Sequence, residues 1–113
     1  MHNYIDALYQ NGEYSENLYN AYEELLANFD KVFIETFDSR MDTQLQKKAK
    51  TLQYADALAE GEHCQKAVEI FGKAMKINSD INKQVIEVAD CIVNAITVSG
   101  KYNDAVDFVK LYF

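Results

Sequence analysis

The sequence predicts an all-α protein of roughly six helices, arranged as about three antiparallel helical hairpins. Three observations support this fold class. A short phrase, a glycine followed by a polar residue and a ring, occurs three times, at Gly12, Gly61 and Gly100. Apolar residues around these glycines recur at steps of three and four, which is the spacing of one helix face. The chain has no proline to break a helix, and its Val- and Ile-rich stretch, 85–98, lacks the alternation expected of a half-buried strand.

The first hairpin is expected over residues 2–38. Its first helix is short, because the apolar residues at helical spacing begin at Tyr4 and a glycine suited to a left-handed helix cap follows at Gly12. The second helix should be long and should end near residues 38–39. Its wide apolar and aromatic face comprises Leu18, Tyr22, Leu25, Leu26, Phe29, Phe33 and Phe37.

The second hairpin is expected over residues 42–78. Asp42 or Thr43 can cap its first helix, and Gly61 ends that helix. The second helix of the pair carries an apolar stripe and stops at a polar run. Gly72 lies inside this helix, where a glycine costs about 1 kcal/mol relative to alanine. A close helix crossing would explain its presence.

The third hairpin is expected over residues 82–113. Its first helix is apolar on most sides and must therefore be covered on most sides. Gly100 ends this helix, and the last helix begins near Tyr102. One polar stripe remains on the first helix of the pair, formed by Glu87, Asp90, Asn94 and Thr97.

Charge and composition narrow the classes of partner. The chain has 113 residues, enough for one domain with a modest core, and a net charge of −7. Residues 1–40 hold eight acids and two bases, so most of the excess charge is N-terminal. Such a field repels phosphate backbones, which argues against nucleic acid, and favours a basic partner. The alternative is that the charge only keeps the protein soluble.

The sequence favours a cytoplasmic location. The two cysteines, Cys64 and Cys91, form neither a disulfide framework nor a zinc-binding pattern. The first residues are too polar for a secretory signal, and no apolar run approaches the roughly 20 residues of a membrane span. We therefore expect no membrane association.

The second and third hairpins resemble the tetratricopeptide repeat (TPR), a helix pair with a Gly-x-Tyr turn followed by small and aromatic residues at set steps. In the second hairpin, Ala67, Phe71 and Ala74 match the family's alanine, aromatic and alanine at steps of four and three. The matching residues of the last hairpin are Gly100, Tyr102 and Ala105.

The chain departs from the family in its period. The glycines are 49 residues apart from Gly12 to Gly61 and 39 apart from Gly61 to Gly100, whereas family repeats recur about every 34 residues. Gly61 also lies one residue too far from Ala67. The resemblance implies a right-handed stack of hairpins, a single domain over residues 1–113, and a non-enzymatic scaffold that binds proteins or peptides.

Family members often bind peptides in a concave groove lined by the first helix of each hairpin. If this chain does so, its acidic groove would select basic or amphipathic segments that carry Lys or Arg. The alternative is that the polar stripe of the fifth helix merely faces water. The groove would be formed chiefly by Asp56, Glu60, Glu87, Asp90, Asn94 and Thr97, with Asp6, Tyr9, Gln10 and Ala59 beside them.

The end of the chain suggests a second function, self-association. A stack of hairpins needs a polar cap over its last apolar face, and here the final residues are largely apolar. This favours a homodimer, or a position within a longer repeat array. The proposed contact face is Val109, Leu111, Tyr112 and Phe113.

Catalysis and metal binding have little support in the sequence. His63 and Cys64 are adjacent, so on a helix their side chains point about 100° apart and cannot act together. Cys91 lies among apolar residues and is expected to fill the core. A metal site formed by Glu60, Glu62, His63 and Cys64 is conceivable, but its spacing is unspecific. We therefore expect no catalytic residues, no metal and no cofactor.

Overall fold

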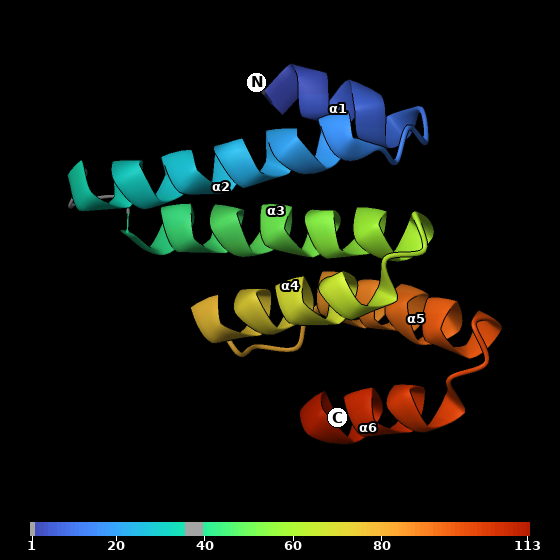
Figure 1. Ribbon diagram of the computed structural model, residues 1–113. Coiled ribbons are helices and arrows are strands. Elements are labelled where there is room, and N and C mark those ends of the chain that lie inside the picture. The colour runs from blue at the N-terminus through green and yellow to red at the C-terminus, as the bar shows by residue number, and fades with distance from the viewer. Residues whose placement is uncertain (1, 36–39) are drawn as a thin grey trace.

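The computed structural model describes the backbone of residues 2–35 and 40–113 and the side chains of residues 4–29 and 44–113. Within these ranges the chain forms six α-helices and no strand, which confirms the all-α prediction (Figure 1). The predicted end of the second helix near 38–39 lies outside the described residues. The helices are α1 (His2–Gln10), α2 (Glu16–Glu35), α3 (Arg40–Glu60), α4 (Cys64–Ile77), α5 (Lys83–Val98) and α6 (Tyr102–Tyr112).

The helices are stacked one beside the next along the molecule, which measures 44 × 29 × 19 Å (Figure 1). α1 lies across α2, α3 lies between α2 and the α4–α5 layer, and α6 lies at the opposite end from α1. α3 packs against α2, α4 and α5, so it is the central element. It begins at Arg40, two residues earlier than the expected start of the second hairpin.

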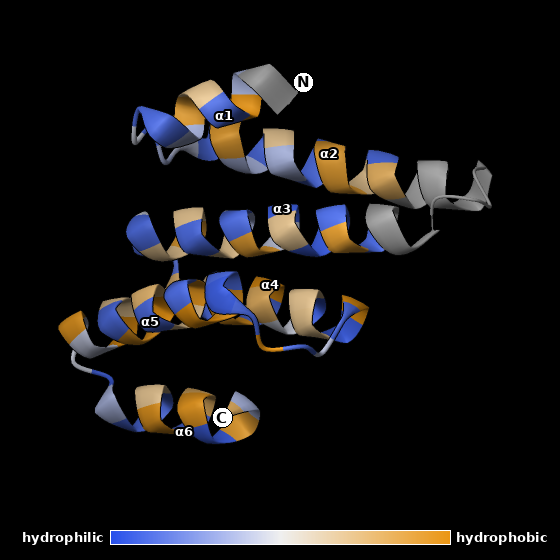
Figure 2. Cartoon of the chain, turned by 180° about the vertical axis from the view of Figure 1, so that it is seen from behind, coloured by the Kyte–Doolittle hydropathy of each residue, from blue (hydrophilic) through white to orange (hydrophobic). Residues whose placement is uncertain are grey.

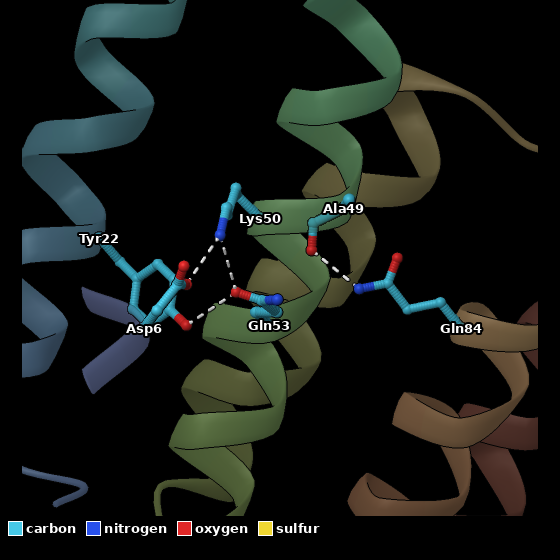
Figure 3. Close-up of polar contacts among 6 residues, drawn as sticks. All are labelled: Asp6, Tyr22, Ala49, Lys50, Gln53 and Gln84. Atoms are coloured by element: carbon cyan, nitrogen blue, oxygen red, sulfur yellow. Dashed lines mark hydrogen bonds and ion pairs between the residues drawn. The ribbon is translucent and has the colours of Figure 1, made fainter. Parts of the chain in front are cut away.

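Polar contacts tie α3 to the first hairpin (Figure 3). The Lys50 ammonium lies 3.1 Å from Asp6 Oδ1 on α1 and donates to Gln53 Oε1 one turn further along α3. The fully buried Tyr22 of α2 donates its hydroxyl to the same Gln53 oxygen at 3.2 Å. Three helices thus share one hydrogen-bonded network, which satisfies the polar groups that their packing takes out of water.

A second set of polar contacts joins α3 to the start of α5. Gln84 Nε2 donates to the Ala49 carbonyl at 3.0 Å (Figure 3). Lys48 is 2% exposed, and its Nζ donates to Asn78 Oδ1 at 3.1 Å and to the Asp80 carbonyl at 2.6 Å. Burial lowers the pKa of Lys48, while the charge of Asp80 acts in the opposite direction. The buried ammonium therefore holds the α4–α5 connection against α3.

Aromatic rings fill the interface between α2 and α3. Tyr22 and Tyr54 are stacked, with centroids 5.3 Å apart and planes inclined by 16°. Tyr19 lies against Tyr54 and meets the edge of His63 at 5.4 Å. The Tyr54 hydroxyl donates to Glu23 Oε1 at 2.7 Å. His63 is itself exposed and contacts this interface through the Tyr19 ring.

The three predicted turns share one hydrogen-bond pattern, the Schellman motif. After α5, Gly100 N–H donates to the Thr97 carbonyl and Lys101 N–H to the Ile96 carbonyl. The same pair of bonds closes α1 and α3. The motif needs one residue with positive φ at the first position beyond the helix cap, and Gly12 (φ 73°) and Gly100 (φ 84°) fill it in the outer turns.

In the middle turn the left-handed position belongs to Glu62, with φ 67°, and not to Gly61. Gly61 does follow the last residue of α3, as expected, but it is not the left-handed residue of the turn. Gly61 is required for a different reason, since a Cβ atom there would collide with the Tyr19 hydroxyl, which donates to the Ala57 carbonyl. This explains why Gly61 lies one residue too far from Ala67. The left-handed residues of the two turns, Glu62 and Gly100, each precede a buried alanine by five residues.

The α4–α6 contact explains the glycine inside α4. Phe71, Phe108 and Tyr112 meet edge to face, with centroids 5.0–5.4 Å apart. The Tyr112 hydroxyl lies 2.9 Å from where a Cβ atom of Gly72 would be. The expected close crossing at Gly72 is therefore made by a tyrosine ring from the last helix.

Candidate binding cleft between α3 and α5

An open cleft of about 550 Å³ lies where the end of α3 meets the second half of α5 and the start of α4. Its wall is formed by small and apolar side chains, and its polar groups are two carboxylates, an amide, a hydroxyl and two thiols. The lining residues are Ala59, Glu60, Glu62, Cys64, Cys91, Asn94, Ala95, Val98 and Ser99.

At one side of the cleft, two carboxylates and a thiol converge. Asp56 and Glu60 are one helical turn apart on α3, so they lie on the same face of that helix. The Cys91 thiol, from α5, donates to Glu60 Oε1 at 3.1 Å. One ligand atom from each of the three residues lies within 4.8 Å of the other two. We refer to Asp56, Glu60 and Cys91 as the acid–thiol cluster.

The surroundings of the acid–thiol cluster keep its thiol protonated. Burial raises the pKa of Cys91 well above its ordinary value, and hydrogen bonds to Asp56 and Glu60 raise it further. Since the thiolate is the nucleophilic form of cysteine, Cys91 is not activated for attack in this state. Tyr9, from α1, donates its hydroxyl to Asp56 Oδ2. The pKa of Tyr9 is also raised, chiefly by burial and further by that hydrogen bond to Asp56.

Three of the residues predicted to line the groove come together here. Glu60 and Asn94 line the cleft, and Asp56 lies beside it in the acid–thiol cluster. Two further residues were expected on the same face. Tyr9 donates a hydrogen bond to Asp56, and Ala59 lines the cleft. The structure therefore gathers side chains from the first helices of all three hairpins.

The rest of the predicted groove residues lie elsewhere. Glu87 and Asp90 are exposed on α5 and are not among the residues that line the cleft, and Glu87 lies 3.9 Å from the exposed Lys83 one turn away. Thr97 donates its hydroxyl to the Val93 carbonyl within its own helix. Along most of its length the polar stripe of α5 faces water, and only Asn94 contributes to the cleft.

Sequence reasoning missed the role of Cys91. The residue is half-buried against the core, as expected of a filler, but its sulfur is turned toward Glu60. The available signal was helical position, since Cys91 flanks the buried stripe of α5. The carboxylate partners lie 31 or more residues earlier on another helix, and only tertiary packing reveals that proximity.

The group Glu60, Glu62, His63 and Cys64, considered from the sequence, does not gather as a metal-binding set. The acid–thiol cluster is the one such group found within the described part of the chain.

The predicted self-association face is divided by the structure. Tyr112 is turned inward onto Phe71, so it belongs to the fold. Val109, Leu111 and Phe113 are 40%, 71% and 54% exposed. Orange, apolar residues are visible along α6 in Figure 2. Three of the four predicted residues are thus available at the surface of the last helix.

Comparisons with protein-family models, with curated proteins and with solved structures found no match to this chain. None of the helices in the described ranges combines the length and apolarity needed to cross a membrane.

Proposed function

We propose that the chain is a non-enzymatic, tetratricopeptide-like scaffold that binds a basic or amphipathic protein segment in the cleft between α3 and α5. The observation that carries the proposal is the composition of this cleft. Glu60 and Glu62 are exposed at its edge, whereas Ala95 and Val98 supply apolar wall. Lys and Arg side chains combine an apolar stem with a cationic head, so they complement both parts of such a surface.

Size and charge agree with this partner class. The cleft volume lies within the range of about 300–1,000 Å³ usual for ligand-binding pockets, which is room for a few side chains. No lysine or arginine is among the residues that line it. The shared turn motif of the three hairpins also supports a repeat architecture, and stacked helical repeats commonly present binding surfaces.

The test is binding of a labelled peptide to the full chain, with a chelator present. A fluorescein-labelled peptide of Lys and Leu is compared by anisotropy with a length-matched peptide of Glu and Leu, at about 0.15 M salt to screen exposed charges. We expect saturable binding of the first peptide only, weakened at least tenfold by Glu62→Lys. Glu24→Lys, an exposed site on α2 with the same change in net charge, should alter it less than twofold. Equal weakening by both variants would show that net charge alone drives binding.

Self-association through α6 is a second candidate function, favoured by the exposure of Leu111 and Phe113. Sedimentation equilibrium at micromolar concentration should then give a dimer that Leu111→Glu dissociates. Lys110→Glu, at the adjacent exposed position, is the control. A wild-type monomer would exclude this candidate.

We also propose a cytoplasmic location. Free thiols at Cys64 and Cys91 suit a reducing compartment. Fractionation of the source cells would test it, and recovery outside the cytoplasmic fraction would contradict it.

A further inference from the structure

We propose that the acid–thiol cluster binds one thiophilic divalent cation, Zn²⁺ or Cd²⁺, through a carboxylate oxygen of Asp56, a carboxylate oxygen of Glu60 and the sulfur of Cys91. The metal site shares Glu60 and Cys91 with the lining of the peptide-binding cleft, whereas Glu62 and the apolar wall belong to the cleft alone.

The geometry is close to that of a formed site. Zinc takes sulfur and oxygen ligands at about 2.0–2.3 Å, so the ligand atoms of a tetrahedral site lie about 3.3–3.8 Å apart. The sulfur of Cys91 is already 3.1 Å from Glu60 Oε1, and all three ligand atoms fall within 4.8 Å of one another. Small rotations of side chains anchored on two packed helices would complete the set.

The charge balance also favours a cation. Two carboxylates and a thiol meet where no lysine or arginine lines the cleft, in a chain whose net charge is −7. Without a cation the neutral thiol donates a hydrogen bond to Glu60, and no positive side chain lines the cleft to offset the two carboxylates. When a divalent ion binds, the S–H bond breaks, a sulfur–metal bond forms and the proton leaves to solvent. No electrons are transferred in this step.

A supporting group and an access path are both present. Metal-bound carboxylates are usually oriented by a further hydrogen bond, and the Tyr9 hydroxyl supplies one to Asp56. The open cleft lets an ion reach the cluster and leaves room for water as a fourth ligand. Three protein ligands with an open fourth position is a common arrangement for zinc.

The experiment titrates the reduced, chelator-treated full chain with Cd²⁺ and follows thiolate-to-metal charge-transfer absorption in the ultraviolet. One Cd²⁺ per chain should give the band, and Zn²⁺ should compete it away. Cys91→Ser should abolish it, whereas Cys64→Ser, in the same cleft but outside the cluster, should keep both band and affinity. Helicity by circular dichroism verifies that each variant is folded.

The carboxylate ligands have matched controls as well. Glu60→Gln should weaken Cd²⁺ binding more than tenfold, while Glu62→Gln should leave it unchanged. Tyr9→Phe should weaken it by about 10-fold, the lower end of what loss of a supporting hydrogen bond costs.

Three results would overturn the proposal. They are no band in the wild-type chain, a band that survives Cys91→Ser, or a stoichiometry of one ion per two chains that depends on Cys64. Because the peptide assay is run with a chelator and depends on Glu62, failure of one proposal leaves the other intact.

Discussion

At the residue scale, the three turns share one hydrogen-bond pattern, but the middle turn uses its glycine for a different purpose from the outer two. The three glycines mark three Schellman turns, yet only Gly12 and Gly100 supply the left-handed residue. Gly61 is needed for the close approach of Tyr19, and Glu62 adopts the conformation that L-residues rarely take. Sequence alone could not separate these roles, because the collision involves a ring from another helix.

Glu62→Gly should therefore stabilise the protein. A non-glycine residue in the left-handed region costs roughly 1 kcal/mol, which glycine avoids. Glu62 serves the turn through its backbone N–H, which donates to the Ala59 carbonyl and which glycine would keep. We expect the free energy of unfolding in urea to rise by about 0.5–1 kcal/mol. Gly100→Ala, which imposes the same strain on a relaxed turn, should lower it by a similar amount. A neutral or destabilising Glu62→Gly would contradict this account.

At the scale of the elements, helix positions follow from apolar periodicity, whereas the contacts that join helices do not. The apolar stripes predicted for α4 and α5 are covered in the structure, where they include the buried Phe71 and Ile92, because one apolar face of an amphipathic helix must be covered. The burial of Lys48 was not predicted, since a lysine within a polar face is normally solvated. Its partners belong to a connection 30 residues later. The candidate cleft was predicted only in part: Glu60 and Asn94 were expected to line it, but Cys91 was not. Its carboxylate partner lies on another helix 31 residues earlier, which the sequence does not reveal.

Lys48→Met should loosen the α4–α5 connection. Methionine fills the space of the lysine stem but cannot donate to Asn78 or to the Asp80 carbonyl, and loss of such bonds costs about 1–3 kcal/mol. Amide hydrogen exchange over residues 78–82 should accelerate more than in α2. Lys76→Met, at an exposed position, should change neither the exchange nor the urea midpoint. Uniform acceleration over the chain would show that Lys48 acts globally instead.

At the scale of the whole molecule, the stack should lose stability in alkali. Burial is the main cause that raises the pKa of Tyr22 and of Tyr54 in the folded protein; nearby Asp6 and Glu23 add to it respectively. In the unfolded chain tyrosine titrates near about pH 10. The folded state thus binds these protons more tightly, so its stability is complete below that pH and falls as pH rises above it. Lys48, whose pKa is lowered, acts in the opposite sense.

The measurement is thermal unfolding by circular dichroism between about pH 8 and 11, with tyrosinate absorbance recorded in parallel. Helicity should be lost together with the appearance of buried tyrosinates. Tyr22→Phe should flatten the pH dependence, while Tyr102→Phe, at a residue 64% exposed, should reproduce the wild-type curve. Titration of every tyrosine near its ordinary pKa, with helicity retained, would refute the prediction.

The hydroxyl of Tyr9 connects α1, the shortest of the described helices, to the side of the cleft. It is held by Asp56, and Asp56 faces Cys91 on the fifth helix. A cation held by Asp56 would therefore be connected to α1 through the hydrogen bond from Tyr9. The attachment of α1 to α3 therefore depends in part on the same carboxylate that we propose as a metal ligand.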